Sequence, residues 1–456
     1  MKSPSIKLVL SVVLILLGAS LAYVATNNTG SSNSSEGIII DFGGRDIDYV
    51  SVSDGSDTMY ALEYACQLKG YELEVDGHDV SSINGLPLPE DNRKWNLFLT
   101  EKGETSWKRS TADPSSVIIG DYSAVSWGLC TENETPTPGV DATGYNYYVY
   151  PQATRVISLA PSCTETICAV GGINTIIGTD QYSNYPHAVV EKQMAGDIAI
   201  VGGYTNPSYE LIIQQNPDLV VCIDGQASHL IVAEKLRNVG INVVVSFDGE
   251  SIDTILDNTH MIGFGMGYTL SLENTLEMLE TGLNDIHTVL AECFQLRYPS
   301  VMVSLSTVKS PWVSGSNTYV SDILNFTFCI NSYEHVSGWV QINSETIVQY
   351  NPSYIIVVSA EYSPTEEDYQ KMMDGLSKEW KSTDAYKTGN IFIYTESAAD
   401  LASRPATRVA QLTEILSRTL HPEAFDDGIQ IPKYIGDNYT DFLTYTKDMG
   451  FNGGSR

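Results

Sequence analysis

A short sequence occurs twice in this chain, 135 residues apart. The first copy, at 210–221, is ELIIQQNPDLVV, and the second, at 345–356, is ETIVQYNPSYII. Six positions before each leading glutamate stands an aromatic residue, Tyr204 in the first copy and Trp339 in the second. A repeat of this kind indicates two related lobes, each with an aromatic and a carboxylate at the same position. That arrangement suits a two-lobed receptor better than a one-domain enzyme.

Each copy of the repeat is predicted to begin a helix. Ser208 and Asn343 stand two positions before Glu210 and Glu345, where they are suitable N-caps. A carboxylate in the first turn is stabilised by the helix dipole by about 0.3–1 kcal/mol without any partner. Capping alone does not require the same residue in both lobes, so the symmetry favours a functional role for these two glutamates.

Length and charge exclude several classes of function. A chain of 456 residues predicts two or three domains. Only 25 Lys and Arg stand against 56 Asp and Glu, which gives a formal net charge of -31. This balance argues against a nucleic-acid partner, which needs concentrated cations, and against a basic face on anionic lipid. The acidity is typical of a solvated surface that resists association.

Metal and enzyme chemistry also lack their usual motifs. The seven histidines and seven cysteines are scattered, with no spacing typical of a metal site. The sequence contains no phosphate-binding loop, HExxH motif or nucleophile elbow. We therefore expect no enzyme activity and no built-in cofactor. At most three disulfides could form, and Cys66 with Cys130 is the favoured pair.

The N-terminal segment is expected to direct the chain out of the cytoplasm. Lys2 and Lys7 precede an uncharged apolar run at 8–25, which is typical of an export signal and long enough to span a bilayer. Residues 1–25 are thus a signal peptide or a membrane anchor, with the anchor slightly favoured. The Asn-, Ser- and Gly-rich segment 26–36 is expected to be a flexible tether.

The rest of the chain divides by pattern into two large parts. Residues 37–131 are predicted to form a small β-rich domain, followed by a Pro- and Thr-containing linker at 132–144. Residues 145–424 alternate strands and helices, which predicts α/β lobes with parallel sheets. Lobe 1 covers about 150–265 and lobe 2 about 299–424, joined by one long helix at about 270–295. Residues 425–456 remain as a C-terminal extension.

With these motifs placed, residues 150–424 resemble a family of periplasmic binding proteins whose Rossmann-like lobes are joined by a rigid helix. The resemblance is carried by RVISLAPSCTE at 155–165, YSNYP at 182–186, PDLV at 217–220, WVSG at 312–315 and RPATR at 404–408. Family members deliver vitamin B12, siderophores or haem to ABC importers, and the B12-binding members are the most similar. The resemblance implies a permease and an ATPase as partners.

The resemblance also implies roles for single residues. Glu210 and Glu345 correspond to the glutamates that dock on permease arginines. The ligand-binding residues would be Tyr182, Tyr204, Trp339, Trp312 and Arg404. Tyr204 stands where the bacterial B12-binding protein has tryptophan, so the ligand face is expected to be similar but not identical. The implied ligand is cobalamin, with a ferric siderophore or haem as alternatives. For haem, the axial ligand would come from Tyr182, Tyr204 or His187.

The N-terminal domain carries a second, shorter resemblance. Trp95-Asn96 and Ser126-Trp127, with the strand pattern around them, are similar to a β-grasp module that also occurs as the small domain of animal cobalamin carriers. The domain could equally serve as a spacer above the membrane. Together with the glycosylation sequons, it keeps a surface adhesion protein as an alternative function.

Each candidate also has a plain structural explanation. Any one of the aromatics could belong to a core, although positions near the carboxyl ends of parallel strands favour a ligand cleft. Arg404 and Arg408 lie just before a predicted helix, which is an unfavourable place for cations. This misfit favours a carboxylate or a ligand amide as their partner.

Overall fold

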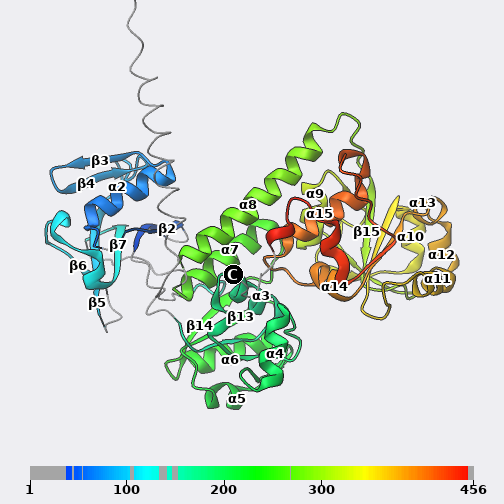
Figure 1. Ribbon diagram of the computed structural model, residues 1–456, viewed down its shortest axis with the longest axis horizontal. Helices are drawn as coiled ribbons and strands as arrows, with labels where there is room; N and C mark the ends of the chain where they lie inside the picture. The colour runs from blue at the N-terminus through cyan, green and yellow to red at the C-terminus, as the bar shows by residue number, and fades with distance from the viewer. Residues whose placement is uncertain are drawn as a thin grey trace, which may run out of the picture.

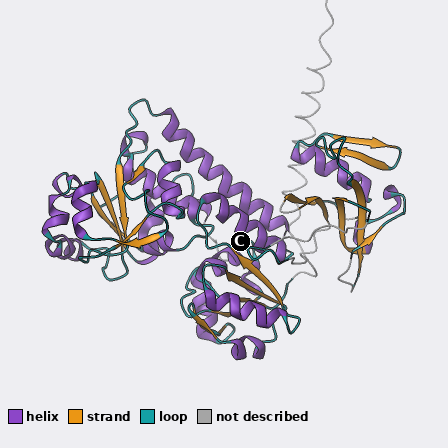
Figure 2. Cartoon of the chain, turned by 180° about the vertical axis from the view of Figure 1, so that it is seen from behind, coloured by secondary structure: helices purple, strands orange, loops and turns teal. Residues whose placement is uncertain are grey.

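The computed structural model describes residues 37–43, 46–53, 55–102, 107–132, 141–145, 153–267 and 269–449. Figure 1 shows three units, a small β-rich domain and two larger lobes, with the long helix α8 (Thr269–Glu292) running between the lobes. Each lobe has a mostly parallel sheet with helices packed beside it, which is also visible from behind in Figure 2. The predicted class is therefore confirmed: two α/β lobes joined by a long helix, preceded by a β-rich domain.

The N-terminal domain has the strand order of a β-grasp sheet. Its sheet runs in the order β2-β1-β7-β5-β6, with β1 parallel to β7 and the remaining neighbours antiparallel. Helix α2 begins where the Asp57 carboxylate accepts the amides of Met59 and Tyr60, and it ends at Gly70 in the left-handed conformation. A hairpin of β3 and β4 follows the helix. The elements are β1 (Gly37–Gly43), β2 (Asp46–Ser51), α2 (Thr58–Lys69), β3 (Leu73–Asp76), β4 (Asp79–Ile83), β5 (Lys94–Glu101), β6 (Lys108–Arg109) and β7 (Tyr122–Cys130).

The expected disulfide between Cys66 and Cys130 is absent. Both residues are buried thiols. Cys66 lies on α2 in the core under the sheet, whereas Cys130 ends β7 and bonds the carbonyl of Gly128 in its own strand. Burial raises the pKa of the Cys66 thiol to about 11, which makes it unreactive at neutral pH.

Lobe 1 is built on a fully parallel sheet with the order β10-β9-β8-β13-β14. The inner strands β8 and β13 are buried at every position, as expected for a sheet covered on both faces. The strands are β8 (Val156–Ser158), β9 (Ile176–Thr179), β10 (Ala199–Ile200), β13 (Leu219–Ile223) and β14 (Asn242–Ser246). The helices that alternate with them are α3 (Pro161–Ala169), α4 (His187–Ala195), α5 (Tyr209–Gln214) and α6 (Ala227–Arg237).

The last residues of the expected linker belong to lobe 1. The fully buried carboxylate of Asp141 accepts bonds from the backbone of Val245, Thr143 and Tyr145 and pairs with the Arg237 guanidinium. The same guanidinium lies 3.9 Å from the ring centre of Tyr145. The chain therefore enters lobe 1 at 141, before the alternating pattern begins. Residues 146–152 lie outside the described residues.

Lobe 2 has a mixed sheet in the order β18-β16-β15-β19-β20-β21, with β17 also beside β15. Strands β16 and β18 are antiparallel, and the others are parallel. The strands are β15 (Ser300–Ser304), β16 (Trp312–Ser314), β17 (Ile330–Asn331), β18 (Trp339–Gln341), β19 (Tyr354–Val358), β20 (Ile391–Tyr394) and β21 (Tyr434–Ile435). The helices are α9 (Tyr319–Phe326), α10 (Ser344–Tyr350), α11 (Glu366–Gly375), α12 (Lys378–Ser382), α13 (Asp384–Lys387), α14 (Glu396–Ser403) and α15 (Val409–Leu420).

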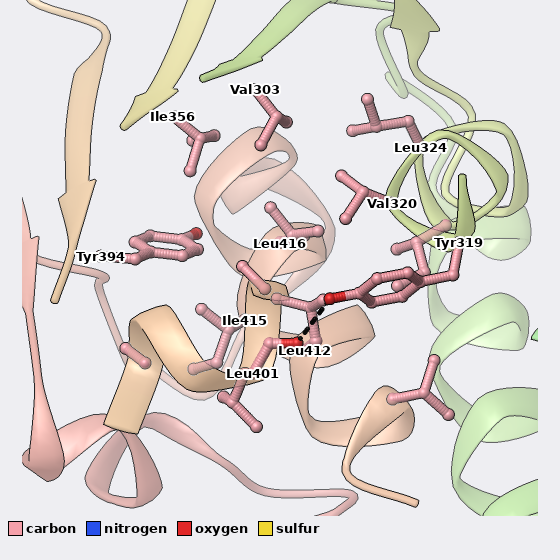
Figure 3. Close-up of a cluster of buried hydrophobic side chains, with 14 of the residues drawn as sticks. Val303, Tyr319, Val320, Leu324, Ile356, Tyr394, Leu401, Leu412, Ile415 and Leu416 are labelled. Atoms are coloured by element: carbon pink, nitrogen blue, oxygen red, sulfur yellow. Dashed lines mark hydrogen bonds between the residues drawn. The ribbon is translucent and has the colours of Figure 1, made fainter. Parts of the chain in front are cut away.

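The C-terminal extension is part of lobe 2. Strand β21 pairs with β20 and completes the sheet. The fully buried carboxylate of Glu414 on α15 accepts the backbone amides of Thr444, Tyr445 and Thr446. Figure 3 shows the apolar side chains gathered around α15, where the Tyr319 hydroxyl donates to the carbonyl of Leu401 at 3.1 Å. The domain therefore continues past the expected boundary at 424.

Two helices, rather than one, connect the lobes. The expected long helix is α8 (Thr269–Glu292), but α7 (Ile252–Gly265) precedes it and packs beside it. Ile252 and Ile255 of α7 lie in the lobe 2 core, while Met261 and Ile262 lie in the lobe 1 core. Helix α8 does the same, with Leu272 in lobe 1 and Leu279 and Leu283 in lobe 2. Both connecting helices are thus anchored in both lobes.

Two further observations concern the N-terminal half. Ile39 and Trp107 of the β-grasp domain pack against the lobe 1 core, so the domain contacts this lobe directly. In the described part of the chain, no helix is both long and apolar enough to cross a membrane. The segments 1–25 and 26–36, expected to be the anchor and the tether, lie outside the described residues.

Candidate functional site

The carboxyl ends of the parallel lobe 1 strands form one edge, and Tyr182 stands there in the loop after β9. The carboxylate of Asp180 fixes this loop because it accepts the Tyr182 amide at 2.7 Å and the Ser183 hydroxyl at 2.5 Å. The Ser183 hydroxyl in turn contacts Thr164 of α3 at 2.7 Å. The Tyr182 side chain is left 56% exposed, as an aromatic that contacts a ligand would be.

Tyr204 lies in the neighbouring loop. It occupies the turn of a small hairpin, β11 (Gly202–Gly203) and β12 (Asn206–Pro207), and the Gln181 amide bonds the Gly202 carbonyl at 3.0 Å. The Tyr204 ring packs edge-on against the His229 ring at 5.5 Å. Burial raises the pKa of Tyr204 to about 12, and the Asp248 carboxylate adds to this shift. The phenol is therefore protonated at neutral pH.

His229 is the residue that holds the Tyr204 turn, and sequence reasoning missed it. Its Nε2 lies 2.7 Å from the Tyr204 carbonyl, and the Ile223 amide faces Nδ1 at 3.5 Å. Burial lowers the pKa of His229, so the ring is neutral. A neutral ring that accepts at Nδ1 carries its hydrogen on Nε2, which donates to Tyr204.

Two carboxylates at the same edge were also missed. Asp224 follows β13 and Asp248 follows β14. Burial raises the pKa of Asp248 to about 6, and the nearby Asp224 and Glu250 carboxylates add to the shift. A Cβ on Gly225 would lie 2.2 Å from the Asp248 carboxyl carbon, so this glycine makes room for the carboxylate. The signal was present in the sequence, because Asp-Gly follows both buried strands.

On lobe 2, Trp312 and Trp339 stand in two adjacent antiparallel strands. Trp312 begins β16 and Trp339 begins β18. In the antiparallel register, Trp339 lies opposite Ser314, two residues after Trp312. Alternate residues share a face, so the two indoles are diagonal neighbours on one side of the ribbon. Trp312 is 47% exposed and Trp339 is half-buried.

Arg404 and Arg408 both bind a carboxylate of the protein. Glu165 of α3, in lobe 1, accepts Arg404 Nη1 at 3.1 Å and two nitrogens of Arg408 at 2.6 and 2.8 Å. Arg404 also pairs with Asp400 at 2.8 Å. The carboxylate partner predicted from the misfit of these arginines is thus Glu165.

Glu210 and Glu345 occupy equivalent places on the two lobes. Ser208 caps α5 and Asn343 caps α10, as predicted, and each glutamate is the second residue of its helix and exposed. Exposed aliphatic side chains flank them, Leu211 and Ile213 on α5 and Val348 on α10.

No group of three or more His, Cys, Asp or Glu side chains suited to a metal occurs within the described ranges. His187 begins α4, is exposed, and lies 3.8 Å from the Glu191 carboxylate one turn later. Its role as an axial ligand stays a prediction.

Comparison with known proteins decides the family, because residues 156–398 match the periplasmic binding protein family. The chain belongs to this family. Its members are solute-binding components of transport systems, not enzymes. Among its relatives is an ABC transporter substrate-binding lipoprotein, YvrC of Bacillus subtilis, 25% identical over 288 residues that cover 63% of this chain and 86% of YvrC. A cobalamin-binding protein of Halobacterium salinarum is 22% identical over 293 residues, 63% of this chain and 74% of that protein.

Solved structures of the family share the fold. The vitamin B12-binding protein BtuF of Vibrio cholerae aligns with a TM-score of 0.50 and 20% identity, over 60% of this chain and 99% of BtuF. The haem-binding protein RhuT of Roseiflexus aligns equally well, with a TM-score of 0.50 and 19% identity, over 60% of this chain and all of RhuT. The two-lobed architecture therefore does not distinguish between these ligands.

Proposed function

We propose that this protein captures a corrinoid such as cobalamin outside the cytoplasm and delivers it to the permease of an ABC importer. The observation that supports this ligand class is that each lobe carries two of the predicted aromatic side chains, Tyr182 and Tyr204 on lobe 1 and Trp312 and Trp339 on lobe 2. A corrin ring is broad and apolar on its faces, so aromatic walls with few polar anchors suit it.

The charges at the lobe edges support a ligand without net negative charge. Asp224 and Asp248 bring carboxylates to the lobe 1 edge, where they could accept the amide groups at the rim of a corrinoid. Arg404 and Arg408 are held by Glu165 and do not offer free cations. An anionic ferric siderophore or the propionates of haem would prefer an edge with unpaired cations.

Haem has a further obstacle at Tyr204. A tyrosine that ligates ferric iron does so as the phenolate, but burial and the Asp248 carboxylate raise the pKa of Tyr204 to about 12. Haem or a ferric siderophore therefore remains the second candidate, favoured by the family alone. A surface adhesion role is favoured by the sequons and the β-grasp domain. No feature of the described parts of the two lobes supports it.

Delivery would use Glu210 and Glu345. Both are exposed on equivalent helices of the two lobes, so they could bind arginines on two halves of a permease. The partners would be the permease and its ATPase. We further propose that the apolar segment at 8–25 and the tether at 26–36 keep the receptor at the membrane surface.

One experiment separates the ligand classes. The purified protein is mixed in turn with cyanocobalamin, haemin and a ferric siderophore, desalted, and examined for the visible absorption of each compound. We expect cyanocobalamin alone to stay with the protein, and a titration then gives its affinity. If the protein retains only haemin or only the siderophore, that compound is the ligand and the corrinoid assignment is wrong. If it retains none of the three, the receptor role is contradicted.

A further inference from the structure

A buried cluster of charges joins the two lobes beside the connecting helices. Glu165 of lobe 1 has a side chain only 1% exposed, and it lies between Arg404 and Arg408, which come from the loop between α14 and α15 of lobe 2. Arg408 is itself 3% exposed and grips both carboxylate oxygens of Glu165. Bidentate pairs of this kind are strongly directional, because two parallel bonds fix the planes of both groups.

A second set of contacts ties the Tyr182 loop to the same region of lobe 2. Arg404 donates to the Asn184 side chain at 2.6 Å and to the Tyr182 carbonyl at 3.4 Å. The Asn184 amide donates to Asp400 at 3.3 Å. The guanidinium of Arg408 also lies 3.9 Å from the ring centre of Tyr185. The loop that carries a proposed ligand residue is thus bound to the opposite lobe.

These contacts argue against a ligand-binding role for Arg404. Its guanidinium already bonds Glu165, Asn184, Asp400 and the Tyr182 carbonyl, and its side chain is only 12% exposed. A ligand would have to displace partners from the protein to reach it. Two arginines face two carboxylates in the cluster, so the formal charges also balance without a ligand.

The cluster lies against the helix that connects the lobes. Glu165 and Arg408 line a pocket with Thr275, Met278 and Leu279 of α8, the helix that connects the lobes. Met449 of the C-terminal extension lines the same pocket and packs against α8 at Gly282. A change in the angle between the lobes would therefore have to break the bonds of Glu165 or lengthen them.

We propose that Glu165 is a positioning residue that, through Arg404 and Arg408, sets the distance between the ligand faces of the two lobes. The relative orientation of the lobes fixes how far Tyr182 and Tyr204 of lobe 1 lie from Trp312 and Trp339 of lobe 2. The expected effect of Glu165 on affinity rests on the proposed function. Its expected effect on the geometry of the lobes does not.

The test compares Glu165→Gln with a matched control, Glu414→Gln. Glu414 is also fully buried and pairs with an arginine, Arg418, at 2.9 Å, but both lie on α15 within lobe 2. Spin labels on Glu234→Cys in α6 and Lys371→Cys in α11, both exposed, report the distance between the lobes in a Cys293→Ser background. Asn184→Ala, which removes an exposed amide and buries no charge, serves as a milder second variant.

The expected results differ between the variants. Glu165→Gln broadens the distribution of distances between the labels and weakens cyanocobalamin binding at least tenfold through faster dissociation. Asn184→Ala changes both in the same direction by less. Glu414→Gln lowers the melting temperature but keeps the wild-type distance distribution and an affinity within twofold of wild type.

Two outcomes would overturn the proposal. One is a folded Glu165→Gln protein with the wild-type distance distribution. The other is a Glu414→Gln protein with an equal loss of affinity, since loss of stability would then explain both. If wild-type protein does not bind cyanocobalamin, the proposed function fails, and the distance measurement decides the role of Glu165 by itself.

Discussion

Trp312 and Trp339 lie diagonally on one face of the β16–β18 ribbon, while Val313 and Val340 between them point to the opposite face and pack in the core. These valines hold the ribbon against one part of the lobe 2 core. On the other side, Trp339 packs partly against a second part of that core, and Trp312 is 47% exposed. This relationship makes the pair a rigid wall instead of two mobile side chains.

Truncation of this wall should weaken ligand binding. We expect Trp339→Ala to reduce the affinity for cyanocobalamin at least tenfold, about 1.4 kcal/mol, because a flat apolar contact is lost. Trp312→Ala should act in the same direction. Phe294→Ala is the control, since Phe294 is fully exposed just beyond the end of α8. This variant should bind the ligand with wild-type affinity. Native affinity of Trp339→Ala in the titration would remove this residue from the site.

Charge reversal at Glu210 and Glu345 should separate transport from binding. The double variant Glu210→Lys/Glu345→Lys is expected to abolish uptake in cells that carry the cognate permease, while the affinity for ligand stays unchanged. Each reversal also costs about 0.3–1 kcal/mol of helix stability. Glu367→Lys is a matched control, because Glu367 is exposed at the second position of α11 and loses the same dipole contact. Unchanged uptake by the double variant would contradict the docking role.

The features that the sequence predicts best are those that depend on residues close together in the chain. The caps of α5 and α10 could be placed from Ser208 and Asn343, because a side chain that caps a helix lies within three residues of the amides it accepts. Strand and helix alternation likewise predicts parallel sheets. Helix α7 was missed although Ser251 and Thr254 form a capping box at its start, a signal that was available.

The interlobe contacts could not be predicted in the same way. Glu165 meets Arg404 and Arg408 across 239 and 243 residues, and no pattern near either arginine identifies the partner. Sequence indicated only that two cations stood in an unfavourable place. The burial of Asp141 could not be predicted for a similar reason, since its Arg237 partner lies 96 residues further along the chain. Pairings of this kind depend on the completed fold.

Acid should destabilise the protein in part through His229. Burial holds the pKa of this ring below its ordinary value of 6.5, so the unfolded chain binds the proton more tightly than the folded protein. Stability is therefore lost as the pH falls through about 6.5. We expect the melting temperature to fall between pH 7 and pH 5, and to fall less in His229→Gln, which keeps a donor near the Tyr204 carbonyl. His187→Gln, at an exposed position, should follow the wild-type curve. Identical pH profiles for wild type and His229→Gln would exclude this residue as a source.

The Asp141 carboxylate should be essential to the stability of lobe 1. Asp141→Ala leaves Arg237, a largely buried cation, without its partner and removes an acceptor from the Val245 amide of β14. Loss of one partner of a buried ion pair costs about 3–5 kcal/mol. We expect a lower melting temperature for the lobes in differential scanning calorimetry. The double variant Asp141→Ala/Arg237→Met, which removes the stranded charge, should recover part of the loss. A single variant that melts at the wild-type temperature would show that residues 141–145 contribute little to lobe 1.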